Sequence, residues 1–194
     1  MLKLSNIYKT FNIGTVDEKR LFNDFSFEID KGEFVSIIGS NGSGKTTMLN
    51  IISGDVMPDS GNVYLSGKDI TKTANYKRAQ NMARVFQNPA NGTCPTMTIF
   101  QNLSIADNKG KMYNLTKGLN TARKDFYRSL LETLGMGLED RLETLAGALS
   151  GGQRQALALL MATISGPDVL LLDEHTAALD PKSADIVMKL TEKV

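Results

Sequence analysis

The feature that most constrains the fold of this 194-residue chain is a glycine-rich octapeptide that directly follows a short apolar run. Residues 39–46 read Gly-Ser-Asn-Gly-Ser-Gly-Lys-Thr and satisfy every fixed position of the phosphate-binding pattern G-x-x-x-x-G-K-[ST]. Glycines here let backbone N–H groups turn toward phosphate oxygens, where a side chain would obstruct them. Residues 34–38 are largely β-branched and do not alternate, as expected for a strand buried on both faces. The octapeptide therefore predicts a nucleotide-binding loop between a buried strand and a helix over residues 45–52.

Each residue type in this loop has a chemical reason to be there. Lys45 places a positive charge near the β and γ phosphates, and the Thr46 hydroxyl is a hard oxygen ligand for Mg²⁺. The helix that begins near Lys45 directs the positive end of its dipole at the same anion. The predicted contacts to ATP in this loop are Gly39, Ser40, Asn41, Gly42, Ser43, Gly44, Lys45, Thr46 and Thr47.

Two acids follow a second apolar run, at the carboxyl end of a predicted strand over residues 169–172. Open α/β sheets bind ligands at that end, so Asp173 is predicted to hold Mg²⁺ directly or through water. Glu174 is predicted to polarise the attacking water as a general base. Two adjacent acids alone would favour a solvated turn, but their place after a buried strand in a chain with a phosphate loop reverses that preference. For His175, a proton carrier and a plain turn residue remain open.

The hydrophobic pattern predicts an α/β fold with a separate antiparallel part and a helical insertion. Residues 2–7 and 21–29 alternate apolar with polar, as half-buried strands do, and residues 61–67 are typical of a hairpin. Residues 84–87 read as the end of a strand. Residues 98–147 change to helical spacing, which predicts an inserted helical subdomain. That spacing is carried by Phe126, Leu130, Leu131 and Leu134.

Composition excludes several classes of protein. With 22 Lys and Arg against 21 Asp and Glu, the net charge of +1 argues against sequence-independent capture of nucleic acid. Cys94 is the one cysteine, so an intrachain disulfide is excluded and a cysteine zinc site is disfavoured. No apolar run approaches the ~18 residues of a membrane span, and the N-terminus lacks a signal-peptide core.

The pentapeptide Leu-Ser-Gly-Gly-Gln at residues 149–153 lies between the two nucleotide motifs and precedes a run compatible with helix from Ala156 to Ile164. It resembles the signature of the ATP-binding-cassette (ABC) family, intact at all five positions. The order and spacing of the motifs resemble that family over nearly the whole chain. The resemblance implies a P-loop NTPase core with an antiparallel β subdomain and an inserted α-helical subdomain.

The resemblance also implies how the chain is divided. Residues 1–194 are expected to form one ABC ATPase domain. Residues 1–97 would hold the P-loop core and the β subdomain, and residues 98–147 the helical subdomain. Residues 148–194 would hold the signature helix, the Asp-Glu motif and the D-loop.

Further site residues are carried over from the family position by position. Phe11 sits where the family stacks an aromatic ring on adenine, although alone it would read as core. Gln87 resembles the glutamine that senses Mg²⁺ and the γ-phosphate, and residues 178–180 resemble the D-loop. With Gln87, the catalytic residues are Lys45 and Glu174, and the Mg²⁺ ligands are Thr46, Gln87 and Asp173. Ser150, Gly151, Gly152 and Gln153 are expected to close over ATP held by a second chain, in a head-to-tail homodimer or paired ATPase subunit.

The resemblance implies an ATP-hydrolysing subunit of an ABC transporter at the cytoplasmic face of the membrane. It would drive a separate permease, with import favoured over export, and it would work beside a substrate-binding protein, with no nucleic acid partner. Residues 88–106, with the apolar Met97, Ile99 and Phe100, would receive the permease, although a buried loop explains them nearly as well. A soluble ABC ATPase acting on nucleic acid or ribosomes is the alternative, and a small-molecule kinase leaves residues 149–153 unexplained.

The chain departs from the family pattern in two places. His175 stands where most relatives have proline, which is similar to a branch of poorly characterised bacterial import ATPases. The switch histidine of the family is expected some thirty residues beyond Glu174, and that position falls past Val194. The resemblance therefore implies a C-terminally truncated chain with weak hydrolysis.

Overall fold

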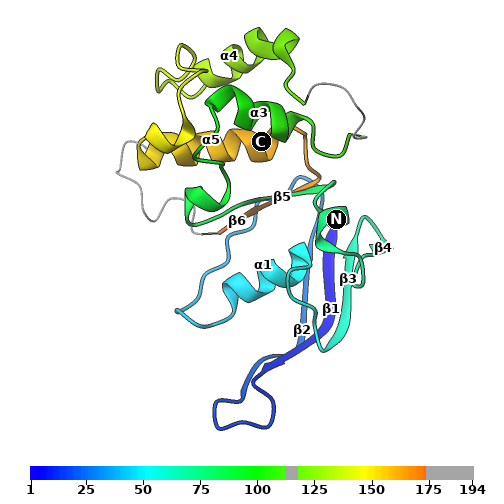
Figure 1. Ribbon diagram of the computed structural model, residues 1–194. Coiled ribbons are helices and arrows are strands. Elements are labelled where there is room, and N and C mark those ends of the chain that lie inside the picture. The colour runs from blue at the N-terminus through cyan, green and yellow to red at the C-terminus, as the bar shows by residue number, and fades with distance from the viewer. Residues whose placement is uncertain (112–117, 174–194) are drawn as a thin grey trace. The chain divides into compact units, whose positions relative to one another are not determined.

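The computed structural model describes residues 1–111 and 118–173 of the chain (Figure 1). They belong to two units, whose boundary along the chain lies between Asn81 and Met82, and each unit has its own architecture. The predicted subdomain boundaries after residues 97 and 147 stay a prediction.

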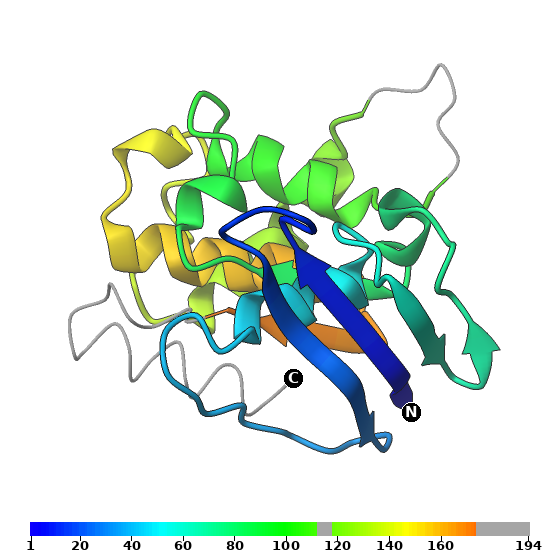
Figure 2. The ribbon, with the colours of Figure 1, turned by 90° about the horizontal axis from the view of Figure 1, so that it is seen from below.

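The first unit is built on an antiparallel sheet of four strands. They are β1 (Leu2–Phe11), β2 (Lys19–Ile29), β3 (Ser60–Leu65) and β4 (Lys68–Asp69), in the order β2-β1-β3-β4. Figures 1 and 2 both show β1 and β2 side by side, with Leu2 opposite Ile29. Leu2 and Leu4 are buried while Lys3 and Ser5 are not, so the β subdomain and the predicted alternation over residues 2–5 are confirmed. The alternation is wrong at residues 6 and 7, because the register shifts between Leu4 and Ile7, which leaves Asn6 exposed and Ile7 buried.

A glycine fixes where β3 crosses β1. A Cβ on Gly61 would lie 2.3 Å from the carbonyl oxygen of Asn6, and Gly61 has a φ of +93°. The register between the two strands shifts between Ser5 and Tyr8, next to this contact. Only glycine allows so close an approach of two backbones.

Helix α1 (Lys45–Ser53) follows the glycine-rich loop, as predicted, and buries Met48, Leu49, Ile51 and Ile52. Its C-terminal carbonyls are satisfied by Arg78, at the end of the short helix α2 (Asn75–Arg78). The Arg78 guanidinium donates to the carbonyls of Ile51 and Ile52, each at 2.8 Å, and to Thr71 O at 2.7 Å. Burial lowers the pKa of Arg78, so these acceptors compensate for lost hydration.

The second unit combines a parallel strand pair with helices. Strand β5 (Met82–Val85) pairs in parallel with β6 (Val169–Leu172), from Met82 opposite Val169 to Val85 opposite Leu172. Its helices are α3 (Ile99–Asp107), α4 (Lys124–Glu132) and α5 (Gly151–Thr163). Three 3₁₀ turns connect them, at Pro89–Asn91, Thr121–Arg123 and Ala146–Ala148.

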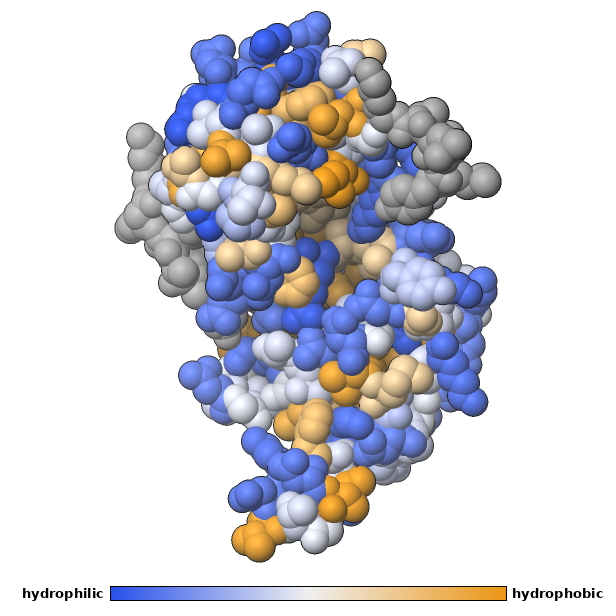
Figure 3. Space-filling model, in the orientation of Figure 1, coloured by the Kyte–Doolittle hydropathy of each residue, from blue (hydrophilic) through white to orange (hydrophobic). Residues whose placement is uncertain are grey.

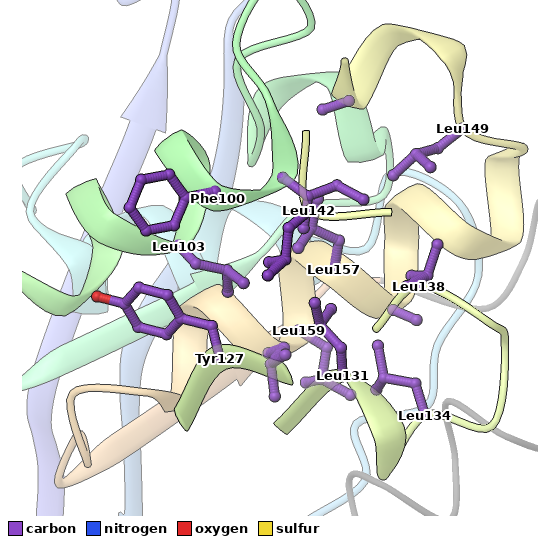
Figure 4. Packing of buried hydrophobic residues seen from close by; sticks show 14 of the residues in the cluster. Phe100, Leu103, Tyr127, Leu131, Leu134, Leu138, Leu142, Leu149, Leu157 and Leu159 are labelled. Carbon is purple, nitrogen blue, oxygen red and sulfur yellow. The ribbon is translucent and has the colours of Figure 1, made fainter. Parts of the chain in front are cut away.

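The core of the second unit lies among its three helices, where leucines from α3, α4 and α5 converge (Figure 4). Leu131 and Leu134 are buried there, as the helical spacing predicts. Phe126 is 40% exposed instead, and Tyr127 takes the inner position and donates from its hydroxyl to Asp107 at 2.9 Å. Burial raises the pKa of Tyr127, which favours the protonated donor.

Two predicted elements differ in the structure. Residues 34–38 form no strand, and Phe34 and Ile38 are 68% and 94% exposed. A strand buried on both faces needs hydrogen-bonded neighbours, and among the described residues the parallel sheet consists of β5 and β6 alone. The signature helix begins at Gly151, five residues before the predicted start, because Ser150 caps it.

Candidate nucleotide-binding site

The glycine-rich loop runs directly into α1, at Lys45. Gly42 and Gly44 have φ values of +78° and +104°, in the left-handed region that glycine tolerates. A Cβ on Gly44 would lie 3.1 Å from atoms of Leu21 and Phe22, so the fold also leaves little room for a side chain there. The Lys45 ammonium donates to Gly39 O at 2.8 Å and to Ser40 O at 3.2 Å.

The N-terminus of α1 lacks the usual negative partner of a helix end. Among the described residues, none caps this end with its side chain, and the first turn contains no acid. Thr46 is exposed and Thr47 half-buried in that turn. The loop and the helix dipole together favour an anion such as a phosphate group.

Asp173 lies at the carboxyl edge of the two-stranded sheet. Its backbone N–H donates to Val85 O at 3.1 Å and so extends the ladder one residue beyond β6. Its carboxylate pairs with Arg84 on the adjacent strand, with Asp173 Oδ2 2.8 Å from Arg84 Nη2. Arg84 also stacks on Phe86, 4.9 Å from the ring centroid. Sequence reasoning missed Arg84 because its partner is 89 residues away.

Gln87 emerges at the same sheet edge as Asp173, because Val85 and Leu172 are paired and end their strands together. Gln87 is exposed. Phe86, the residue before Gln87, is hydrogen-bonded to the signature helix, since the buried Gln155 of α5 donates to Phe86 O at 3.3 Å. The structure therefore brings Gln87 and Asp173 to one edge and connects that edge to α5.

The signature sequence forms a capped helix start. The Ser150 hydroxyl accepts from the Gln153 backbone N–H, and the Gln153 side chain accepts from the Ser150 N–H, both at 3.2 Å. Ser150 and Gly151 are exposed, while Gly152 is buried. A Cβ on Gly151 would meet no atom of the described chain within 4 Å. The packing of the described residues therefore does not require glycine at that position.

A family comparison accounts for these motifs together. The sequence matches the ABC transporter family over residues 22–177, most of the chain. The chain belongs to the ABC transporter family. ATP hydrolysis is the activity of this family, and its P-loop NTPase fold confirms the predicted fold class.

The ABC relatives include transport ATP-binding proteins. The chain is 49% identical to a tyrosine transport ATP-binding protein of Clostridioides difficile (strain R20291), over all of this chain and 77% of that protein. It is 38% identical to the spermidine/putrescine import ATP-binding protein PotA of Haemophilus influenzae, over 94% of this chain and 44% of that one. The chain thus spans less than half of the second relative. These names place it among the ATPase subunits of ABC transporters, with import favoured.

Solved ABC cassettes have the same fold. The dimeric structure of MJ0796, a bacterial ABC transporter cassette, matches with a TM-score of 0.82 and 30% identity, over 100% of this chain and 82% of that one. A second dimeric structure of MJ0796, in a post-hydrolysis state with ADP and Pi, matches with a TM-score of 0.80.

The remaining ABC site residues fall into three groups. Phe11 ends β1 in the first unit, half-buried, with the Lys9 ammonium 5.4 Å from its ring centroid. Gln87, the signature residues and Asp173 all belong to the second unit. Glu174, His175 and residues 178–180 lie outside the described residues, so their predicted roles stay predictions.

Two of the three apolar residues predicted to receive the permease are buried, which favours the alternative of a buried loop for Ile99 and Phe100, while Met97 is half-buried. Ile99 is fully buried and Phe100 is 4% exposed, because both pack in the helical core. The loop before them is held by the buried Asn102, which accepts from the Cys94 N–H and donates to Cys94 O and Thr98 O. Figure 3 shows apolar surface scattered among polar atoms on the face in view. Within the described parts of the chain, no helix has the length and apolar character of a membrane span.

Proposed function

We propose that this chain binds MgATP through its glycine-rich loop and hydrolyses it to power uptake of a small solute through a separate permease. The observation that carries the proposal is the loop at the start of α1. The positive φ of Gly42 and Gly44, together with the hydrogen bonds from the Lys45 ammonium to carbonyl groups of the loop, supports an anion cradle there. Phe11 would stack on the adenine, and Glu174 would act as the general base toward water.

The donor set fits Mg²⁺. Thr46, Gln87 and Asp173 offer a hydroxyl, an amide oxygen and a carboxylate, which are the hard oxygen ligands that this ion prefers. Among the described residues, no group of three or more His, Cys, Asp or Glu gathers into an all-protein metal cage. When bound, Mg²⁺ would neutralise charge on the phosphates.

The signature helix would serve a second copy. Ser150, Gly151, Gly152 and Gln153 would close over ATP held by a partner cassette, in a homodimer or paired subunit. The exposed start of α5, together with a glycine that the described packing does not require, supports contact with something beyond this chain. The similar MJ0796 cassette is dimeric.

An amino acid is the first cargo to test. The relative with 49% identity is named for tyrosine transport, whereas more distant relatives are named for polyamine and methionine import. In this proposal the chain works at the cytoplasmic face of the membrane, bound to a permease and served by a substrate-binding protein. Reconstitution with the permease should give ATP-dependent uptake of labelled tyrosine. Uptake of spermidine or methionine instead would overturn the cargo assignment.

Lys45→Ala tests the loop. Loss of a charged donor should weaken binding of a fluorescent ATP analogue about ten- to a hundredfold. Lys31→Ala, which removes an exposed lysine from the turn before the loop, is the matched control and should bind normally. Equal binding by Lys45→Ala and Lys31→Ala would exclude the loop as the nucleotide site.

Glu174→Gln tests the general base. The variant should keep its affinity for the ATP analogue while turnover falls about 10²- to 10⁴-fold. Size-exclusion chromatography with MgATP should then show a trapped dimer. Full turnover by this variant would remove Glu174 from the mechanism.

A further inference from the structure

The ion pair between Arg84 and Asp173 differs from the surface pairs of this chain. The two side chains are only 11% and 13% exposed, whereas those of Lys3 and Glu28 are 42% and 46% exposed. Attraction between charges is stronger where water is excluded, and a buried charge that loses its partner is costly. Arg84 and Asp173 therefore depend on each other far more than a surface pair does.

Both members of the pair are held by strand geometry. Arg84 is the third residue of β5, and Asp173 follows β6 with its N–H bonded to Val85 O. The guanidinium is planar and stacks on Phe86, which restricts its rotation further. A rigid cation on one strand thus fixes the direction of the carboxylate at the end of the next.

We propose that Arg84 is the counter-ion of Asp173 before Mg²⁺ arrives, so that Mg²⁺ must share this carboxylate with the guanidinium. The inference rests on the proposed function in taking Asp173 as a Mg²⁺ ligand. A carboxylate has about four lone-pair sites, so the bond to Arg84 is compatible with a second cation. Two cations on one carboxylate repel each other, so Arg84 raises the Mg²⁺ concentration that the site requires.

Mg²⁺ titration tests this competition without measuring turnover. Binding of a fluorescent ATP analogue is followed as Mg²⁺ is raised, for the wild type, Arg84→Gln and Arg84→Lys. Removing the charge in Arg84→Gln should lower the half-saturating Mg²⁺ concentration about tenfold. Arg84→Lys, which keeps the charge, should stay close to the wild type. An unchanged or higher Mg²⁺ requirement in Arg84→Gln would overturn the proposal.

A double-mutant cycle tests the pair without any ligand. Thermal unfolding is measured in EDTA for Arg84→Gln, Asp173→Asn and the double variant. Each single change should lower the unfolding temperature, and the double variant should lose less than the sum of the two losses, because the second change removes one member of an ion pair that the first has already broken. Strictly additive losses would overturn the counter-ion role. Arg128→Gln, at a pair whose side chains are 51% and 94% exposed, is the control and should change little.

The two proposals fail in different ways. If the wild type binds no ATP analogue at any Mg²⁺ concentration, the proposed function is wrong, and the unfolding cycle still decides whether Arg84 is the counter-ion. If the analogue binds and Lys45→Ala abolishes binding, but Arg84→Gln leaves the Mg²⁺ requirement unchanged, the proposed function stands and the inference about Arg84 is wrong.

Discussion

At the scale of single residues, the buried Arg78 and the half-buried Arg84 have different tasks. Arg78 donates to backbone carbonyls at the end of α1, whereas Arg84 meets a carboxylate. The first compensates for polar groups that the fold must bury, and the second holds a group with a proposed chemical role. A guanidinium suits both tasks because it offers five donors in one plane.

Arg78→Met should be among the most destabilising single changes in the first unit. It leaves buried carbonyls at Ile51, Ile52 and Thr71 without their donor, at a cost of about 3 kcal/mol or more. Urea unfolding measures the loss. The free energy of unfolding of Arg78→Lys should fall between those of the wild type and Arg78→Met, because lysine keeps the charge but lacks the planar guanidinium. A loss below about 1 kcal/mol for Arg78→Met would contradict this account.

Asp59 should make stability depend on pH at the acid end. The pKa of Asp59 is lowered mainly by a hydrogen bond from the Lys9 ammonium and, to a smaller extent, by one from the Thr10 N–H. A lowered folded-state pKa gives stability that is present above the unfolded value of about 4 and is lost as the pH falls through the folded value. Asp59→Asn should therefore cost about 0.5–1 kcal/mol at pH 7, after allowance for solvent screening, and less in acid.

Thermal unfolding between pH 2 and pH 7 measures the effect of Asp59→Asn. The matched control is Asp140→Asn, an exposed aspartate whose replacement should leave the curve close to that of the wild type. A destabilisation by Asp59→Asn that stays constant across this range would show that the lowered pKa contributes nothing.

The residue scale also shows what sequence could reveal about the site. The P-loop lysine is found because all its determinants are contiguous in the chain. Arg84 and Arg78 are not, since their partners lie 89 and up to 27 residues away. A charged residue in a strand pattern signals only that some partner exists, and the partner is set by the register of β5 against β6.

At the scale of elements, local patterns predict the ones that need only local information. Alternation is enough to predict β1 and β2, because Leu2 and Leu4 are buried in β1 and the alternating apolar residues of β2 from Phe25 to Ile29 are half-buried. The strand predicted over residues 34–38 is absent because an apolar run indicates that a segment favours burial, but does not show whether neighbouring strands are present to pair with it. The start of α5 at Gly151 could have been predicted from the sequence, since Ser150 and Gln153 form the Ser-x-x-Gln pattern of a capping box.

Gly151→Ala should separate folding from dimer formation at the start of α5. A Cβ there meets no atom within 4 Å in the part of the chain that the structure describes, and alanine is favoured over glycine in a helix by up to about 1 kcal/mol. The variant should therefore be as stable as the wild type or more so, yet its ATP-dependent dimer and its turnover should be reduced more than tenfold if a partner's nucleotide approaches here.

Gly118→Ala is the control for Gly151→Ala and should leave both properties unchanged, because a Cβ on Gly118 would also meet no atom of the described residues within 4 Å. Unfolding temperature, size-exclusion chromatography with MgATP and phosphate release are the measurements. Normal dimer formation and turnover in Gly151→Ala would remove that glycine from the proposed interface.

At the scale of the whole molecule, each unit has its own buried residues. Leu4 and Ile7 are buried in the first unit, while the second is centred on leucines of α3, α4 and α5. Composition and helical spacing predict that such cores exist. The exchange of Phe126 for Tyr127 on the inner face of α4 lay beyond sequence reasoning, because it depends on Asp107 of α3 accepting the tyrosine hydroxyl.

Leu131→Ala should lower protection from hydrogen exchange in α3, α4 and α5. The side chain is fully buried, and its truncation should cost about 2–5 kcal/mol. Leu4→Ala, buried to a similar degree in β1, is the paired variant and should lower protection in β1, β2 and β3. If Leu131→Ala left exchange in α3 and α5 unchanged, the cluster would not be a cooperative core.

The lysine of the glycine-rich loop has a consequence for the kinetics of nucleotide capture. The Lys45 ammonium uses two of its three N–H donors on Gly39 O and Ser40 O, so a phosphate that accepts from more than one of these donors must draw the ammonium away from a carbonyl group. Nucleotide binding therefore includes a unimolecular step in which Lys45 breaks a hydrogen bond to the loop. At high nucleotide concentration the observed association rate should therefore level off instead of rising without limit.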